Sequence, residues 1–220
     1  MTAIATIKTA EAAFLATDTA YLKRNGKVSH FDHKIGTFES LKLAMAVQGP
    51  GGMMKLCYQV LCERFLAFTQ ADLLNALPDA LREARLRQAE LVPQHEGLGH
   101  NEAILWLAFW DEALDCPRLA SITTAQLDCL PDQEPYKLYE NAGMLSPAVD
   151  ESLLDQTQTD PDKLFVQIGL LQRQSPHFAE FGIECSVGGK IELCQITRDG
   201  LVLETVHSFG DKVGRKLSGR

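Results

Sequence analysis

Residues 93–115 read PQHEGLGHNEAILWLAFWDEALD and contain the densest apolar segment of the chain. Eight consecutive apolar residues, 103–110, include both of the protein's tryptophans. A helix that is apolar on every side has to lie inside a domain, because none of its faces belongs in water. Asn101 stands at an N-cap position and Glu102 in a first turn, which are favourable residues for a helix start. This stretch therefore predicts a central buried helix over residues 102–115.

Apolar residues at helical spacing predict four more helices before that segment. The expected ranges are 7–24, 37–47, 53–68 and 70–92. A glycine follows the first of them and a Gly-Pro-Gly-Gly run follows the second, and such residues end helices. Residues 1–130 are therefore expected to form a helical domain.

The pattern changes in the last third of the chain. Prolines interrupt residues 131–162, which are expected to form a connection. Asp160-Pro161-Asp162 combines a cap, a proline at the first helical position and a carboxylate in the first turn, and this predicts a helix over 161–174. Three β-branched, partly alternating runs follow at 181–187, 190–197 and 201–209, separated by turn residues, and they predict an antiparallel meander.

Together these elements predict an α+β fold, with a mainly α-helical N-terminal part and a C-terminal helix plus three-stranded antiparallel β-meander. Three strands cannot bury both of their own faces, so residues 163–209 are expected to pack on the helical domain. Residues 210–220 contain few large apolar side chains and are expected to be a mobile tail.

The composition narrows the class of protein. Hydrophobic residues make up 45% and charged residues 23% of the 220 residues, which is typical of a folded globular protein. The net charge of −8 argues against broad binding to nucleic acid or to an anionic membrane surface. The apolar runs are much shorter than the roughly 20 residues of a membrane-spanning helix, so no membrane insertion is expected. The six cysteines form no C-x-x-C pair, and no secretory signal is recognisable, which favours a cytoplasmic location.

Two histidine-containing segments form the first candidate site. Imidazole together with carboxylate is the ligand set that zinc, iron or manganese takes. The candidate ligands of a divalent metal are His30, Asp32, His33, His95, Glu96 and His100. Their spacing matches no established metal motif, so the hypothesis requires the two segments to meet in the folded protein.

Two further candidate sites rest on shorter patterns. Gly51 and Gly52 precede a predicted helix that carries Lys55, and the free N–H groups at a helix start bind anions. Trp106 and Trp110 could line a pocket for a flat or apolar ligand.

The sequence alone ranks a non-catalytic interaction or regulatory module first, because it contains no catalytic motif and predicts an exposed strand edge for pairing. A protein partner or a homo-oligomer is expected. The alternatives are a metal-dependent enzyme or metal sensor built on the histidine segments, and a binder of small apolar ligands beside the two tryptophans.

Overall fold

The computed structural model describes residues 3–23, 25–64, 69–91, 102–175 and 185–218. Most of its regular structure is β-strand. The strands are β1 (Ile4–Lys8), β2 (Ala12–Asp18), β3 (Ala20–Leu22), β4 (Val28–Phe31), β5 (Ile35–Phe38), β6 (Leu43–Gln48), β7 (Ile104–Asp111), β8 (Cys116–Thr123), β9 (Tyr139–Asn141), β10 (Met144–Ser146), β11 (Lys190–Thr197) and β12 (Gly200–Ser208). The helices are α1 (Met53–Arg64), α2 (Gln70–Leu91) and α3 (Pro161–Gln174), with short 3₁₀ turns η1 (Glu39–Leu41) and η2 (Glu151–Leu153).

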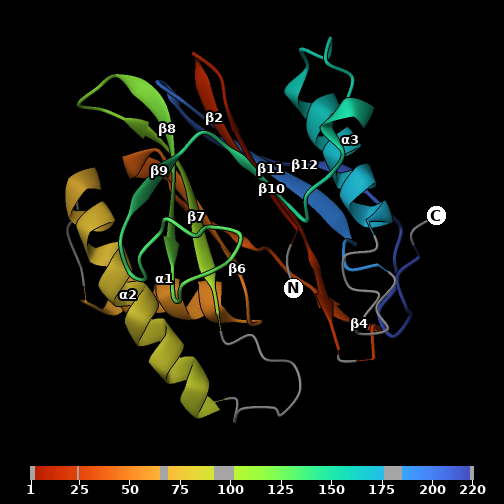
Figure 1. The fold of residues 1–220 in the computed structure, drawn as a ribbon, viewed down its shortest axis with the longest axis horizontal. Helices are drawn as coiled ribbons and strands as arrows, with labels where there is room; N and C mark the ends of the chain where they lie inside the picture. The colour runs from red at the N-terminus through yellow and green to blue at the C-terminus, as the bar shows by residue number, and fades with distance from the viewer. Residues whose placement is uncertain (1–2, 24, 65–68, 92–101, 176–184, 219–220) are drawn as a thin grey trace.

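The strands form two five-stranded antiparallel sheets and a small β3–β4 pair. Sheet 1 has the order β10-β1-β2-β11-β12, and sheet 2 has the order β5-β6-β7-β8-β9. The two sheets pack face to face, with α1 and α2 on the outer face of sheet 2 and α3 on the outer face of sheet 1 (Figure 1). The molecule is therefore a four-layer α-β-β-α sandwich.

The structure contradicts the expected α+β fold with a mainly α-helical N-terminal part. The predicted central helix over 102–115 is instead β7, the middle strand of sheet 2. Leu105, Leu107 and Phe109 pack against α1 and α2, whereas Trp106 and Trp110 pack between the sheets. A strand covered on both faces is apolar at nearly every position, and a short continuous apolar run does not distinguish it from a buried helix.

The same cause explains the error at the N-terminus. The predicted helix over 7–24 is instead β1, β2 and β3, and every residue of β2 is buried. Ala13 and Leu15 face sheet 2, while Phe14 faces α3. The predicted helix over 37–47 is likewise β5, η1 and β6, with Lys42 in the left-handed conformation between the last two.

Three of the predicted helices are confirmed, and each lies on the surface of the sandwich. They are α1, α2 and α3, and α3 begins after the predicted Asp160 cap, whose side chain accepts a hydrogen bond from the N–H of Asp162. Of the three predicted meander strands, the second and third are β11 and β12. The first run, 181–187, lies partly outside the described residues, and its described part, from residue 185, is not a strand.

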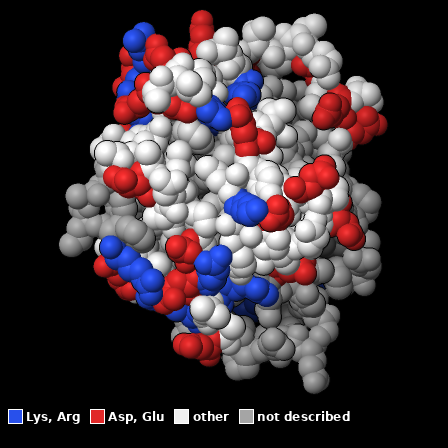
Figure 2. Space-filling view, turned by 60° about the vertical axis from the view of Figure 1, so that its left-hand side comes forward, with Lys and Arg blue, Asp and Glu red and all other residues white. Residues whose placement is uncertain are grey.

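The surface carries charges of both signs. On the side shown in Figure 2, Lys and Arg side chains lie among Asp and Glu side chains. On α1 and α2, for example, Arg87 bonds both Glu63 and Glu83. Among the described residues, no helix has the length and hydrophobicity needed to cross a membrane.

Candidate active site around Lys34 and Asp18

Asp18, the last residue of β2, has a buried carboxylate that accepts four hydrogen bonds. Its Oδ1 accepts from Lys34 Nζ at 2.7 Å and from the backbone N–H of Ala3 at 3.0 Å. Its Oδ2 accepts from the N–H groups of Ala20 and Gly188, both at 3.2 Å. A buried charge requires such partners, because removal from water is otherwise very costly. Asp18 therefore joins the start of β1, the β2–β3 junction and the loop before β11 at one point.

Lys34 lies between β4 and β5, and its side chain is only 2% exposed. Its Nζ also donates a hydrogen bond of 2.7 Å to the carbonyl of Ala20. Burial lowers the pKa of Lys34 below the ordinary lysine value, although the nearby carboxylates of Asp18 and Glu192 oppose this change. An amine whose pKa is lowered in this way exchanges a proton more readily near neutral pH.

The ring of Tyr21 covers one side of the amine. Lys34 Nζ lies 5.0 Å from the ring centroid, and the Tyr21 ring also stacks on His30 at 4.6 Å between centroids. Burial and the negative charges of Asp32 and Asp18 raise the pKa of Tyr21 to about 12. The phenol therefore stays neutral near physiological pH.

A second buried carboxylate, Glu192 on β11, lies close enough to Lys34 to affect its pKa. Glu192 Oε1 contacts Nδ1 of the exposed His33 at 2.7 Å. Glu192 Oε2 and Oγ1 of its register partner Thr17 are both buried and have no hydrogen-bond partner in the described part of the chain. The Lys34 amine is thus influenced by two buried carboxylates, those of Asp18 and Glu192.

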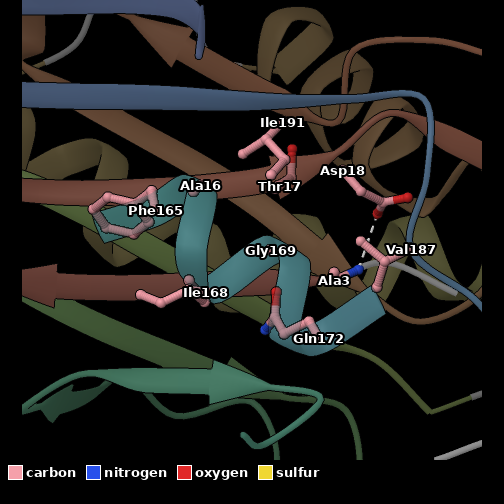
Figure 3. Close-up of a pocket in the computed structure, with 11 residues that line it drawn as sticks. Ala3, Ala16, Thr17, Asp18, Phe165, Ile168, Gly169, Gln172, Val187 and Ile191 are labelled. Carbon is pink, nitrogen blue, oxygen red and sulfur yellow. Dashed lines mark hydrogen bonds between the residues drawn. The ribbon is translucent and has the colours of Figure 1, made fainter. Parts of the chain in front are cut away.

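A cavity of about 10 Å³ lies between α3 and sheet 1, beside Asp18 and Ala3 (Figure 3). Its wall is mostly apolar and includes Phe165, Ile168 and Ile191. This volume is close to the minimum that holds one water molecule. The cavity is therefore a packing gap behind the site and does not have the size of a substrate pocket.

The described residues include only half of the predicted metal ligands. His30 contacts Ser29 Oγ through Nδ1, Asp32 pairs with Lys55, and His33 pairs with Glu192. The other three, His95, Glu96 and His100, lie outside the described residues. Within the described ranges, no three His, Cys, Asp or Glu side chains form a metal-binding group. The metal hypothesis needs both segments and stays a prediction.

The residues of the other two predicted sites make local structural contacts. Gly51 and Gly52 precede α1, as expected, and Lys55 forms an ion pair with Asp32. Both tryptophans are buried: the Trp106 indole donates to Gln48 Oε1 at 3.4 Å, and the Trp110 indole donates to Asp115 Oδ1 at 3.2 Å. These contacts test neither anion binding nor ligand binding, so both remain predictions.

Sequence reasoning misses Asp18 and Lys34. The signal that reveals them is a charged residue on a strand that is buried on both faces, because such a residue requires a partner of opposite charge. Once residues 12–18 are read as a strand, Asp18 is that residue. Lys34 directly follows the HFDH segment, which attracts attention for its histidines.

Comparison with known proteins relates this chain to solved structures by fold. Anbu (ancestral beta-subunit) from Yersinia bercovieri matches with a TM-score of 0.61 and 12% identity, over 95% of this chain and 88% of that one. An Anbu (Gly-1) mutant from Hyphomicrobium sp. strain MC1 matches with a TM-score of 0.62 and 12% identity, over 96% and 89%. No protein-family model matches the sequence, and no curated protein matches it. At this level of identity the likeness shows a shared fold alone.

Proposed function

We propose that this protein is an N-terminal threonine hydrolase that cleaves amide bonds of peptides, with Thr2 as its nucleophile. The observation that carries the proposal is the hydrogen bond from the Ala3 N–H to the same Asp18 oxygen that binds Lys34. Thr2 directly precedes Ala3 in the sequence, and it carries the hydroxyl that we assign as the nucleophile. A threonine hydroxyl becomes an effective nucleophile when a neighbouring amine takes its proton.

The reaction follows from this set of groups. The Thr2 hydroxyl oxygen attacks the carbonyl carbon of the amide bond and passes its proton to a basic amine. The C–N bond then breaks, and the leaving amine takes up that proton. An ester between Thr2 and the acyl group remains, and water hydrolyses it to release the acid and restore the hydroxyl.

Two amines are available for the proton transfer in this proposal. One is the α-amine of Thr2, which exists only after the peptide bond before Thr2 is cleaved. The other is the Lys34 amine, whose lowered pKa suits it to accept and return a proton. Asp18 holds Lys34 in position through the 2.7 Å contact, and its buried charge limits how far the pKa of Lys34 falls.

Hydrolysis of fluorogenic peptides by the purified protein tests this function. Mass spectrometry of the intact protein first establishes whether Thr2 is the N-terminal residue. We expect Thr2→Ala to abolish hydrolysis and Thr2→Ser to retain part of it, because only serine keeps the hydroxyl. Thr157→Ala is the matched control, since Thr157 is exposed. Equal hydrolysis by the wild-type protein and Thr2→Ala would exclude Thr2 as the nucleophile.

Assembly with other subunits is part of the same proposal. The Yersinia chain that shares the fold is described as a beta-subunit, which supports the expectation that this chain forms a homo-oligomer or binds a protein partner. Light scattering after size-exclusion chromatography measures the mass of the assembly, and a mass of 24.3 kDa at all concentrations would contradict a homo-oligomer.

The function ranked first from the sequence and its two alternatives remain predictions. The non-catalytic interaction module differs from the hydrolase in one measurable respect, since it predicts no hydrolysis that depends on Thr2. Metal analysis of protein purified without a histidine tag tests the metal-dependent alternative, and quenching of tryptophan fluorescence by small apolar ligands tests the binder.

A further inference from the structure

The loop that connects Val187 to Lys190 is bound on two sides. On one side, the N–H of Gly188 donates to Asp18 Oδ2 at 3.2 Å, and the Gly188 carbonyl accepts from Ala20 at 3.1 Å. On the other side, the N–H of the next residue, Gly189, donates to Asp211 Oδ2 at 2.9 Å. Asp211 therefore binds Gly189, which directly follows Gly188, a hydrogen-bond donor to Asp18.

Arg173, near the end of α3, completes this arrangement. Its Nη1 and Nη2 donate to the two oxygens of Asp211, each at 2.8 Å. Nη1 also donates to the Val187 carbonyl at 3.0 Å, and Nε donates to the Ser218 carbonyl at 2.9 Å. The side chains of Arg173 and Asp211 are only 7% and 10% exposed. Burial favours a raised pKa for Asp211, but the bonds from Arg173 and Gly189 hold that pKa below the usual aspartate value.

The chain after β12 packs against the same region. The N–H of Val28 donates to the Arg215 carbonyl and the N–H of Gly214 donates to the Val28 carbonyl, both at 2.8 Å. Leu217 is buried with Ala20, Val28 and Cys185. The fit at Gly188 is tight, since a Cβ there would lie 2.7 Å from Leu217 and 2.8 Å from Asp211. Residues 209–218 thus form a strap, the C-terminal strap, across the back of the site.

We propose that Asp211 and Arg173 are positioning residues. They fix the Gly188–Gly189 backbone, so that the N–H of Gly188 holds the Asp18 carboxylate in position to bind Lys34. The C-terminal strap is then part of the scaffold of the site. This inference rests on the proposed function for its catalytic meaning, but the link from Asp211 to Lys34 is measurable without any activity.

The charge and both oxygens of Asp211 are needed for this role. The two oxygens accept three hydrogen bonds, two from Arg173 and one from Gly189. In Asp211→Asn an NH₂ group replaces one oxygen, so at least one buried donor loses its acceptor, and an unsatisfied buried donor is costly. In Arg173→Lys the charge remains, but the planar fork that reaches both oxygens is lost.

The decisive experiment compares Asp211→Asn with the wild-type full-length protein by NMR of the Lys34 side-chain amine. We expect the Lys34 Nζ signal and its pH titration to move in Asp211→Asn and to stay unchanged in the matched control Asp199→Asn, which alters an exposed turn residue. An unchanged Lys34 titration in folded Asp211→Asn overturns the positioning role. If Asp211→Asn does not fold, Arg173→Lys provides the same comparison with the same two outcomes.

A second readout separates this inference from the proposed function. The rate at which a peptide electrophile labels Thr2 is expected to fall on the order of tenfold to a hundredfold in Asp211→Asn, because displacement of a catalytic group reduces rates by such factors. If the wild-type protein is not labelled at Thr2, the proposed function is contradicted, while the Lys34 titration still decides the positioning role. If Thr2 is labelled equally fast in both proteins, Asp211 has no role in catalysis.

Discussion

The Lys34 amine lies 2.7 Å from Asp18 Oδ1, and the two side chains are 2% and 0% exposed. This pair connects the β4–β5 segment to the end of β2 and, through Asp18, to the backbone of Ala3 at the start of β1. The pair therefore links the segment before β5 of sheet 2 to strands β1 and β2 of sheet 1.

Removal of the lysine charge is expected to destabilise the protein. Lys34→Met leaves Asp18 buried without its opposite charge, and breaking such a pair costs about 3 to 5 kcal/mol of unfolding free energy. Lys55→Met is the matched control, because the Lys55 and Asp32 side chains are 61% and 30% exposed and ion pairs near the surface contribute about 0 to 1 kcal/mol. Denaturant unfolding measures both values, and similar losses in the two variants would contradict the importance of the buried pair.

The pH dependence of hydrolysis is expected to follow the protonation state of the Lys34 amine. Burial lowers its pKa, and the charges of Asp18 and Glu192 limit that decrease, so the rate should rise as pH increases through this lowered pKa. Glu192→Gln removes one negative charge and should move the rising limb of the pH–rate profile to lower pH. An unmoved limb, with an unchanged melting temperature, would show that Lys34 does not control the profile.

The lowered pKa of Lys34 is also expected to make the unfolding free energy depend on pH. Its pKa in the folded protein is lower than the ordinary lysine value of 10.5, so the unfolded chain binds more protons between these two values. The contribution of Lys34 to unfolding free energy therefore rises with pH across that window. The measurement is denaturant unfolding at several pH values, in which Lys34→Met should lack this rise.

Among the protein's four tyrosines, Tyr21 is expected to lose its proton at unusually high pH. Its pKa is raised to about 12, so its stabilising contribution is fully present below about pH 10 and is lost as pH rises from about 10 to about 12. Ultraviolet absorbance titration should contain a late step that disappears in Tyr21→Phe. A single step near the ordinary tyrosine pKa in the wild-type protein would be inconsistent with the buried ring beside Lys34.

The contact between α3 and β11 is expected to be intolerant of added volume. A Cβ at Gly169 would lie 2.2 Å from Ile191 Cδ1, so Gly169→Ala should lower unfolding free energy by about 1 to 3 kcal/mol, the usual cost of overpacking. Ile191→Val removes that methyl group. The double variant should therefore lose less unfolding free energy than the two single variants lose together. Strict additivity of the two losses would contradict the close contact.

The sequence predicts the surface helices better than the buried strands. On α1, α2 and α3 the apolar residues occupy one face, and this periodicity is visible without a structure. In β2 and β7 both faces are covered, so the alternation that marks a strand is absent. The apolar run in 93–115 therefore predicts a helix, although its residues point alternately to two different cores.

The candidate site is hidden from sequence reasoning for a related reason. Asp18 and Lys34 are 16 positions apart in the sequence, and their contact depends on strand pairing that the helical interpretation excludes. The HFDH segment attracts attention for its histidines, but the buried charge beside it in the structure is Lys34. A buried charge pair becomes predictable only when the strands that bury it have been assigned.

Chemical labelling tests most directly whether Thr2 is the nucleophile of a hydrolase. The wild-type protein is incubated with a peptide electrophile, and the labelled residue is identified by mass spectrometry of the N-terminal peptide. We predict one label per chain, on Thr2, with strongly reduced labelling in Lys34→Met. A label on another residue, or no label on a folded protein whose N-terminus is Thr2, would contradict this role of Thr2.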